Sequence, residues 1–380
     1  MQTDPRFALV AGEASGDLLA GLMLDGLYAR WPALQAVGIG GPQMLARGFQ
    51  SWWPQEKLAV RGYVEVLRHY AEIAGIRREL KARLLAERPD VFIGVDAPDF
   101  NLDLEARLRA QGVKTAHFVC PSIWAWRPGR IEKIRAAAHH VLCIFPFEPD
   151  LLAAQDVDAS YVGHPLAQAI PMEPNRAAAR AALALPMESP VVALLPGSRE
   201  SEWRYMASRF FAAAKLMRAS DPAIEFVVPV PASRRVQAER LLQESGMQGQ
   251  IKWVEGQSHA VLAACDVTLV ASGTATLEAA LFKRPMVIAY AMNPLSYRLM
   301  VHKQLQPWIG LPNILCREFV VPELIQHEAT PQALARATLD WLAAPQRVHA
   351  LQRRFAGLHA ELRRDTPALC ADAIQKVLDA

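Results

Sequence analysis

The turn formed by Ser272, Gly273 and Thr274 is the stretch of the sequence best suited to binding an anion. An apolar, β-branched run precedes it and a segment of helical composition follows it, which predicts strand, turn and helix. Small residues let a phosphate approach the backbone, and the first N–H groups of a helix attract negative charge. Glu278, one helical turn later, could accept a hydrogen bond from a ribose hydroxyl. An ordinary turn followed by a solvated glutamate remains the alternative, because parallel sheets contain many such turns.

Gly197, Ser198 and Arg199 form a second turn of this kind, after an apolar strand at 190–195. The guanidinium of Arg199 suits a diphosphate, because it can donate two parallel hydrogen bonds to phosphate oxygens. Two anion-binding turns and one ribose-binding carboxylate in the second half of the chain predict a nucleoside diphosphate site without a metal ion.

Carboxylates in the first half of the chain follow predicted strands. Asp96 comes directly after the apolar run 91–95, at the edge where open α/β sheets bind ligands. Burial there would raise its pKa and make it usable as a general base. Asp99 precedes a helical segment and has helix capping as its alternative role. In the turn after the first strand, we expect Glu13 to face the ligand and Asp17 to cap a helix.

The loop 121–130 has more aromatic and basic side chains than a connection needs. Trp124, Trp126, Arg127 and Arg130 could hold an apolar, anionic ligand. A loop folded onto its own domain is the alternative.

The segment 51–88 combines an apolar helical stripe with many arginines, among them Arg77 and Arg78. This pattern suits a membrane surface with anionic headgroups. A stripe that faces the core, with a solvated basic face opposite, is the commoner cause of the same pattern.

Length and composition favour a globular protein of two domains. A chain of 380 residues exceeds the usual size of a single core. The near balance of 41 basic and 38 acidic residues argues against non-specific nucleic-acid binding. The five cysteines have no metal-binding spacing, which favours reduced thiols in a cytoplasmic protein. The first apolar run is too short for a signal peptide, and no window reaches the roughly 18 apolar residues of a spanning helix. Any membrane association is therefore expected to be peripheral.

Strand, turn and helix alternate in both halves of the chain. We expect an α/β protein of two doubly wound Rossmann-like domains that face each other across a cleft, with a helical C-terminus. The expected boundaries are 1–170 for the first domain, 171–345 for the second and 346–380 for C-terminal helices that cross back to the first domain or to a partner subunit. Gly38, Gly40 and Gly41 indicate a glycine-rich bend.

Several motifs, in order along nearly the whole chain, resemble the lipid-A-disaccharide synthase family. They are GEASGD at 12–17, VDAPDFN at 95–101, PSIWAWRPGR at 121–130, GHPL at 163–166, LLPGSRESE at 194–202, ASGTATLEAAL at 271–281 and GLPNIL at 310–315. The resemblance implies a GT-B fold and no cofactor. It also implies an inverting transfer of 2,3-diacylglucosamine from UDP to the 6-hydroxyl of 2,3-diacylglucosamine 1-phosphate, which gives a β-1,6-linked disaccharide and UDP.

The resemblance further implies roles for individual residues. Asp96 would deprotonate the acceptor hydroxyl, and Arg199 would stabilise the charge on the departing UDP. Glu13 would line the acceptor side, Glu278 would hold the ribose, and Asn313 would approach the donor. The acylated substrates imply a peripheral location on the inner face of the cytoplasmic membrane, and the family pattern favours a homodimer through the C-terminal helices.

One departure and two alternatives qualify this interpretation. After Tyr290 the resemblance leads us to expect a basic residue, but Ala291 and Met292 stand there, so the donor contacts of this segment stay open. A UDP-N-acetylglucosamine 2-epimerase would use a similar fold without needing the Trp and Arg loop. A non-catalytic binding protein for lipid or nucleotide sugar would bind without turnover.

Overall fold

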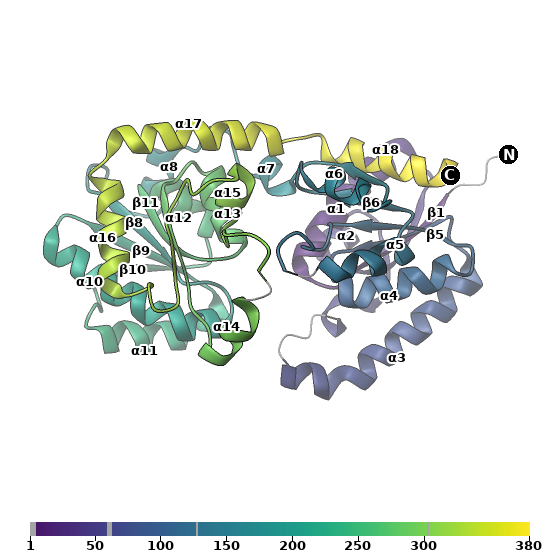
Figure 1. Cartoon of the computed structure of the whole chain (residues 1–380), viewed down its shortest axis with the longest axis horizontal. Helices are drawn as coiled ribbons and strands as arrows, with labels where there is room; N and C mark the ends of the chain where they lie inside the picture. The colour runs from purple at the N-terminus through teal and green to yellow at the C-terminus, as the bar shows by residue number, and fades with distance from the viewer. Residues whose placement is uncertain (1–4, 59–62, 127, 302–303) are drawn as a thin grey trace. The chain divides into compact units, whose positions relative to one another are not determined.

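The computed structural model describes residues 5–58, 63–126, 128–301 and 304–380 (Figure 1). The chain divides into two compact units, each with its own sheet. The first unit contains Met1–Gln168 and Glu361–Ala380, and the second contains Ala169–Ala360. The predicted third segment is thereby divided, because most of its first helix belongs to the second unit and its last helix belongs to the first.

The first unit is built on a parallel sheet of seven strands in the order β3-β2-β1-β4-β5-β6-β7. The strands are β1 (Arg6–Ala11), β2 (Gln35–Gly40), β3 (Gln50–Pro54), β4 (Val91–Val95), β5 (Lys114–Phe118), β6 (His140–Cys143) and β7 (Ala159–Tyr161). The order reverses direction between β1 and β4, so a crevice opens at the carboxyl ends of these two strands. Glu13 follows β1 and Asp96 follows β4, which places both carboxylates at that crevice.

Helices cover both faces of this sheet. They are α1 (Ala14–Arg30), α2 (Pro42–Leu45), α3 (Tyr63–Glu87), α4 (Pro98–Arg109), α5 (Ile131–Ala137), α6 (Glu148–Ala153), α7 (Pro165–Ala169) and α18 (Thr366–Asp379), with single 3₁₀ turns at Gln55–Lys57 and Pro128–Arg130. On α3 the apolar side chains of Ile76, Leu80 and Leu84 are buried in the core. The commoner interpretation of this stripe therefore holds for the second half of α3.

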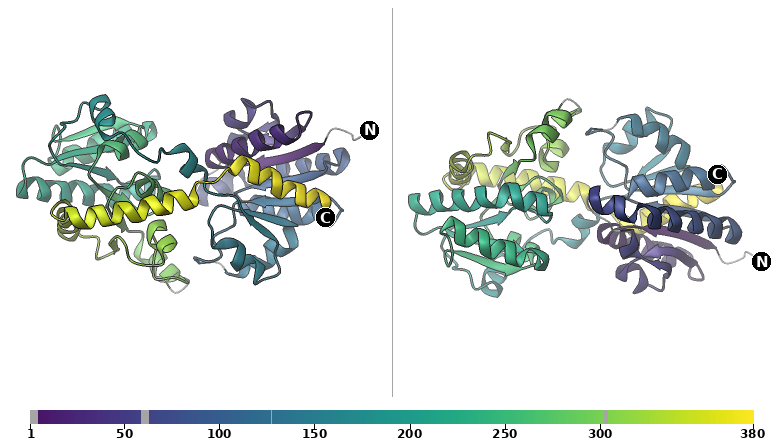
Figure 2. Two further views of the ribbon diagram at one scale, coloured as in Figure 1. Left: turned by 90° about the horizontal axis from the view of Figure 1, so that it is seen from above. Right: turned by 90° about the horizontal axis from the view of Figure 1, so that it is seen from below.

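The C-terminal helix α18 packs on α1 of the same chain (Figure 2). The two helices approach so closely that a Cβ atom on Gly26 would lie 1.9 Å from the carbonyl oxygen of Pro367. An ion pair between Arg30 and Asp372 joins the same two helices. The last residues of the chain thus complete the domain that its first residues begin.

The second unit has a parallel sheet of six strands in the order β10-β9-β8-β11-β12-β13. The strands are β8 (Val191–Leu195), β9 (Glu225–Val230), β10 (Ile251–Glu255), β11 (Val267–Ala271), β12 (Met286–Tyr290) and β13 (Glu323–Ile325). Direction reverses between β8 and β11, so the crevice of this sheet lies between the two predicted anion-binding turns.

The helices of the second unit are α8 (Arg176–Ala182), α9 (Glu200–Glu202), α10 (Ser208–Ser220), α11 (Arg235–Ser245), α12 (Ser258–Ala264), α13 (Thr274–Leu281), α14 (Pro294–Val301), α15 (Leu311–Cys316), α16 (Pro331–Leu342) and α17 (Pro345–Leu362). A π-helical turn at Trp203–Ala207 joins α9 to α10, and a 3₁₀ turn at Ala232–Arg234 precedes α11. Trp203 and Trp341 are fully buried between these helices and the sheet.

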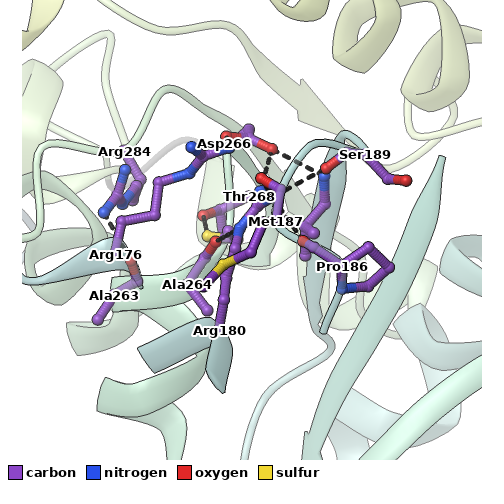
Figure 3. Close-up of polar contacts among 12 residues, drawn as sticks. Arg176, Arg180, Pro186, Met187, Ser189, Ala263, Ala264, Asp266, Thr268 and Arg284 are labelled. Carbon is purple, nitrogen blue, oxygen red and sulfur yellow. Dashed lines mark hydrogen bonds and ion pairs between the residues drawn. The ribbon is translucent and has the colours of Figure 1, made fainter. Parts of the chain in front are cut away.

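Arg180 lies at the opposite side of the second sheet, where the amino ends of β8 and β11 are found, and it holds the neighbouring segments together (Figure 3). Its guanidinium donates to the Asp266 carboxylate at 2.6 Å. It also donates to backbone carbonyls before β8 and at the end of α12, namely those of Pro186, Met187, Ser189 and Ala264. Asp266 in turn accepts from the Val191 N–H at 2.8 Å. A buried charge is tolerated here because all of these partners are in place.

One sequence prediction about the first sheet was wrong. Gly38 and Gly40 belong to strand β2 and do not form a bend. A Cβ atom on Gly38 would lie 2.1 Å from the Leu9 carbonyl oxygen, so the glycine allows β2 and β1 to pair closely. Only Gly41 lies beyond the strand, at the start of α2.

Candidate functional site

The two predicted anion-binding turns meet at one cavity of the second unit. The cavity has a volume of about 410 Å³ and lies at the carboxyl ends of β8 and β11. Its wall contains the predicted residues Gly197, Ser198, Arg199, Ser272, Gly273, Thr274 and Glu278. Two turns that stand 75 positions apart in the chain, at 197–199 and 272–274, therefore line a single space.

The turn after β11 is held in place by its first residue. The Ser272 N–H donates to the Ala289 carbonyl at 3.0 Å, and its hydroxyl donates to the Ile309 carbonyl at 3.1 Å. Gly273 has a φ of +154°, which favours glycine, and it precedes α13 without a side-chain cap. The N-terminal end of α13, at Thr274, therefore lies at the cavity. The positive end of the helix dipole is located there, and it would stabilise a bound anion.

The turn after β8 differs from its prediction. The N–H groups of Ser198 and Arg199 donate to the Glu202 carboxylate, at 2.8 and 3.1 Å. Gly197 has a φ of +114°, and a Cβ atom there would lie 2.2 Å from Glu202 Oε2. Glu202 therefore occupies two amides that an anion bound at the start of this helix would otherwise contact.

The guanidinium of Arg199 remains accessible in this turn. Its side chain is 71% exposed and makes a contact of 3.4 Å with Glu202. Arg199 thus contributes to the cavity through its side chain, whereas the neighbouring backbone serves to hold the turn.

Glu278 lies in the cavity wall on the first turns of α13. Burial raises the pKa of its carboxyl group, and His259 on α12, with Nε2 3.7 Å from Glu278 Oε2, acts in the opposite direction. In its ionised form, the Glu278 carboxylate can accept hydrogen bonds from the hydroxyl groups of a ligand.

Asp96 lines a smaller cavity of about 140 Å³ in the first unit, together with Trp126 and Arg130. Burial raises the pKa of the Asp96 carboxyl group, and the charge of Glu13 adds to this effect. The charge of His117 lowers that pKa, as does a hydrogen bond from the Ala97 N–H. The sequence-based expectation of a raised pKa agrees with this arrangement.

The backbone around the Asp96 cavity is strained. Asp96, Ala97 and Val119 have φ values of +52°, +42° and +80°. Left-handed conformations of non-glycine residues cost about 1–3 kcal/mol each and concentrate at functional sites. The Asp96 N–H donates to the Phe118 carbonyl at 2.8 Å, which ties the turn to β5.

Two other predicted residues of the first unit form an ion pair beside this cavity. Asp99 is 82% exposed and pairs with Arg130 at 2.5 Å. Helix α4 begins at Pro98 without a side-chain cap, so the alternative role of Asp99 as a helix cap is not observed. Trp126 is 38% exposed, which leaves its ring accessible to a ligand.

Trp124 belongs to the core of the first unit. It is buried, and its indole N–H donates to the Glu148 carboxylate at 3.0 Å. Its ring packs edge-on against Phe145 and Phe147. The alternative, a loop folded onto its own domain, therefore describes Trp124, and a contact of Trp124 with a ligand stays a prediction. Arg127 lies outside the described residues.

Asn313 is also structural. Its fully buried amide donates to Val321 O and Glu323 Oε1 and accepts from the N–H groups of Val320 and Val321. Glu323 accepts from the Gly310 N–H, so this network holds the loop before α15. These partners use the hydrogen-bonding capacity of the Asn313 side chain, and its approach to a donor stays a prediction.

Asp17 has a structural role, whereas Arg77 and Arg78 lie on helix α3 outside both cavities. Asp17 caps a helix, as expected, but the helix is α2, since its carboxylate accepts from the N–H groups of Gly41, Gln43 and Met44. Arg77 contacts Asp103 at 3.4 Å, and Arg78 is exposed.

Sequence reasoning missed three residues around these cavities. Glu202 had a local signal, because it stands three residues after Arg199 as in a capping box. His117 and Glu105 had none, since their buried contact joins β5 to α4.

Within the described residues, no group of three side chains has the composition and geometry of a metal site. In the same part of the chain, no helix is long and apolar enough to span a bilayer.

Comparison with known sequences places the chain beside one enzyme family. The sequence profile described as lipid-A-disaccharide synthetase matches residues 7–374. The lipid-A-disaccharide synthase of Albidiferax ferrireducens is 64% identical over 98% of this chain and 97% of its own length. That of Verminephrobacter eiseniae is 60% identical over 100% of this chain and 98% of its own length.

Solved structures share the fold at low sequence identity. A putative UDP-N-acetylglucosamine 2-epimerase from Listeria monocytogenes aligns with a TM-score of 0.64 at 11% identity, over 99% of this chain and 96% of that one. The glycosyltransferase of kitacinnamycin aligns with a TM-score of 0.61 at 16% identity, over 99% and 100%. These likenesses show the two-domain α/β fold of GT-B glycosyltransferases.

Proposed function

The chain belongs to the lipid-A-disaccharide synthase family, and from that premise we propose that it joins two acylated glucosamine units into the lipid A disaccharide. In this reaction 2,3-diacylglucosamine passes from UDP to the 6-hydroxyl of 2,3-diacylglucosamine 1-phosphate, with inversion at the anomeric carbon. The observation that carries the proposal is the convergence of Arg199, the α13 N-terminus and Glu278 on one cavity.

The cavity of the second unit supports binding of the UDP part of the donor. The N-terminal end of α13 and the exposed guanidinium of Arg199 supply positive charge for the diphosphate. Glu278 supplies an acceptor for a ribose hydroxyl. As the bond to the sugar breaks, negative charge grows on UDP, and Arg199 stabilises that charge.

Asp96 is the proposed general base. Inversion in a single displacement needs one group to take the proton of the attacking hydroxyl. The raised pKa of Asp96 strengthens it as a base, while its access to the small cavity with Trp126 and Arg130 allows a hydroxyl to approach. Glu13, whose charge acts on Asp96, is proposed to line the acceptor side.

The acyl chains of both substrates make a membrane surface a partner of the protein. They favour a peripheral location on the inner face of the cytoplasmic membrane, where Arg77 and Arg78 are proposed to contact anionic headgroups. Co-sedimentation with anionic vesicles should fall in the Arg77→Glu, Arg78→Glu variant, and unchanged binding would contradict this part.

A homodimer formed through the C-terminal helices is also proposed. Light scattering tests it by measuring the molar mass in solution, and the mass of a single chain would contradict it.

The decisive experiment measures UDP release and product mass with purified protein and both acylated substrates. We expect disaccharide from the parent protein, with or without EDTA, and loss of activity in Asp96→Ala. If folded protein binds UDP but forms no disaccharide, the proposal fails. Conversion of UDP-N-acetylglucosamine to its 2-epimer would then favour the epimerase alternative.

A further inference from the structure

Arg130 has a largely enclosed guanidinium with few hydrogen bonds. The residue ends the 3₁₀ turn Pro128–Arg130, directly before α5, and its side chain is 16% exposed. Among the residues that the structure describes, its one hydrogen-bond partner is Asp99, with Nη2 2.5 Å from Oδ1. The buried Arg180, by contrast, donates to a carboxylate and to four backbone carbonyls. Since a guanidinium has five N–H donors, Arg130 keeps most of its bonding capacity.

Asp99 is a weak partner for this guanidinium. Its side chain is 82% exposed, in the first turn of α4, so water surrounds most of the carboxylate. An ion pair with so exposed a partner contributes little, because water solvates the separated charge nearly as well. Another anion can therefore take the place of Asp99 on Arg130 without a large loss of stability.

Arg130 lines the same cavity as Asp96, the proposed base. The cavity volume of about 140 Å³ is below the roughly 300–1,000 Å³ of most ligand pockets, so it suits the polar end of one ligand and has no room for a second. Groups on its wall therefore act on the same ligand. Arg130 is the basic side chain among the described residues of that wall. An anionic ligand held beside the Asp96 carboxylate needs such a positive charge, because like charges repel.

The acceptor of the proposed reaction carries an anion on the sugar ring that also carries the reacting hydroxyl. Its 6-hydroxyl has to reach Asp96, and the phosphate on carbon 1 belongs to the same ring. At neutral pH a phosphate monoester carries a charge of about −1.5 to −2 and has three acceptor oxygens, whereas a carboxylate has a single charge and two oxygens. A guanidinium binds phosphate through two parallel hydrogen bonds. For Arg130 the phosphate is thus a stronger partner than the Asp99 carboxylate.

We propose that Arg130 binds the phosphate group of the acceptor and that this phosphate displaces Asp99 from the guanidinium. The inference rests on the proposed function, because it assigns the phosphate of that acceptor to a residue in the cavity of the proposed base. Asp99 holds the Arg130 side chain in place before the acceptor binds, and it competes with the acceptor for the same donors. Arg130 thereby selects an acceptor with a phosphate over the same lipid without one.

The test uses Arg130→Gln and Asp99→Asn in the full chain, each with a matched control. Lys133 on α5 and Asp103 on α4 stand about one helical turn after the two residues and face each other at 3.9 Å. Lys133→Gln and Asp103→Asn therefore remove the same charges from the same two helices. Neither control residue is among those that line the cavity.

Calorimetric titration without the donor measures the affinity for 2,3-diacylglucosamine 1-phosphate and for the same lipid without its phosphate, both in detergent micelles. We expect Arg130→Gln to weaken binding of the phosphorylated lipid about 10- to 100-fold and to leave binding of the other lipid unchanged. Asp99→Asn should tighten binding of the phosphorylated lipid about 2- to 5-fold, because a competing carboxylate is lost. Both controls should bind like the parent protein, and the affinity for UDP should be the same in all variants.

Equal weakening of both lipids in Arg130→Gln overturns the proposal, because a merely structural arginine would not distinguish them. A parent protein without preference for the phosphorylated lipid, or a lower UDP affinity in Arg130→Gln, also overturns it. If Arg130→Gln does not fold, Asp99→Asn decides, since it changes an exposed side chain and unchanged or weaker binding contradicts the displacement. Phosphate-dependent binding through Arg130 without disaccharide formation would retain this site and reject the proposed function. Disaccharide formation without such binding would do the reverse.

Discussion

Arg180 and Arg199 lie at opposite edges of the same sheet and have opposite surroundings. Arg180, at the amino edge, is 1% exposed and donates to Asp266 and to a set of backbone carbonyls. Arg199, at the carboxyl edge, is 71% exposed beside a cavity. The guanidinium of Arg180 stabilises the fold because the chain surrounds it. That of Arg199 remains available for a ligand because it lies beyond the carboxyl ends of the strands.

The carboxylates at the two edges differ in the same way. Asp266 accepts from Arg176 at 2.7 Å, from Arg180 at 2.6 Å and from the Val191 N–H. Glu278 lies in the cavity wall, with His259 3.7 Å away. Arg199 and Glu278 are thus left with bonding capacity at the carboxyl ends of the strands, where open α/β sheets bind their ligands.

Replacing Arg180 should give the largest effect on stability. Arg180→Ala removes a buried donor, leaves several buried carbonyls without their partner and takes one of two arginines from Asp266, so we expect a loss of about 3–5 kcal/mol in the free energy of unfolding. Urea unfolding measures it. Arg199→Ala is the control and should change stability by less than about 0.5 kcal/mol. Equal losses in the two variants would contradict the contrast between the edges.

Replacing Arg199 should give the largest effect on catalysis at constant stability. We expect Arg199→Ala to lower kcat about 10²- to 10³-fold, because a charge on the departing UDP loses its partner. Steady-state kinetics of UDP release measures this effect. Arg204→Ala, an exposed arginine on the following turn, should behave like the parent protein. A parent-like kcat in Arg199→Ala would remove Arg199 from the mechanism.

Glu202 tests whether the backbone of its turn is structural. In Glu202→Ala the Ser198 and Arg199 amides lose their acceptor, and we expect stability to fall by about 1–3 kcal/mol, with weaker UDP binding. Thermal unfolding and calorimetric titration with UDP measure the two effects. Tighter UDP binding in this variant would instead show that the freed amides serve a phosphate.

Glu278 should give the smallest effect, and one that depends on pH. Burial raises the pKa of its carboxyl group, so protonation begins at a higher pH than for an exposed glutamate. The protonated form loses charge-assisted hydrogen bonding to the ribose, and UDP affinity should fall as the pH drops through that raised pKa. We expect Glu278→Gln to weaken binding about 3- to 10-fold at neutral pH and to abolish this pH dependence. The same pH dependence in variant and parent would assign it to another group.

Local sequence predicted those elements whose residues carry their own signal. The apolar runs of β1, β4, β8 and β11 were recognised because both faces of these strands are buried, so every buried position in them is apolar or small. Strands β2 and β3 were missed, since one is interrupted by glycines and the other ends in proline.

The accessibility of each side chain was not predictable in the same way. Trp124 and Trp126 stand two residues apart in one loop, yet one is buried against Glu148 and the other lines a cavity. The difference depends on which face of the loop meets α6, and the sequence of the loop contains no record of that contact.

What the sequence by itself determined are the turns and their chemistry: small residues after β11, an arginine after β8 and an aspartate after β4, each at a strand end set by local hydrophobicity. What only the tertiary structure decided is which polar groups are used up inside the protein. Glu202 occupies two amides, and Asn313 satisfies its neighbours. The physical reason is that a hydrogen bond or a buried charge depends on the partner brought to it, and folding rather than residue type supplies that partner.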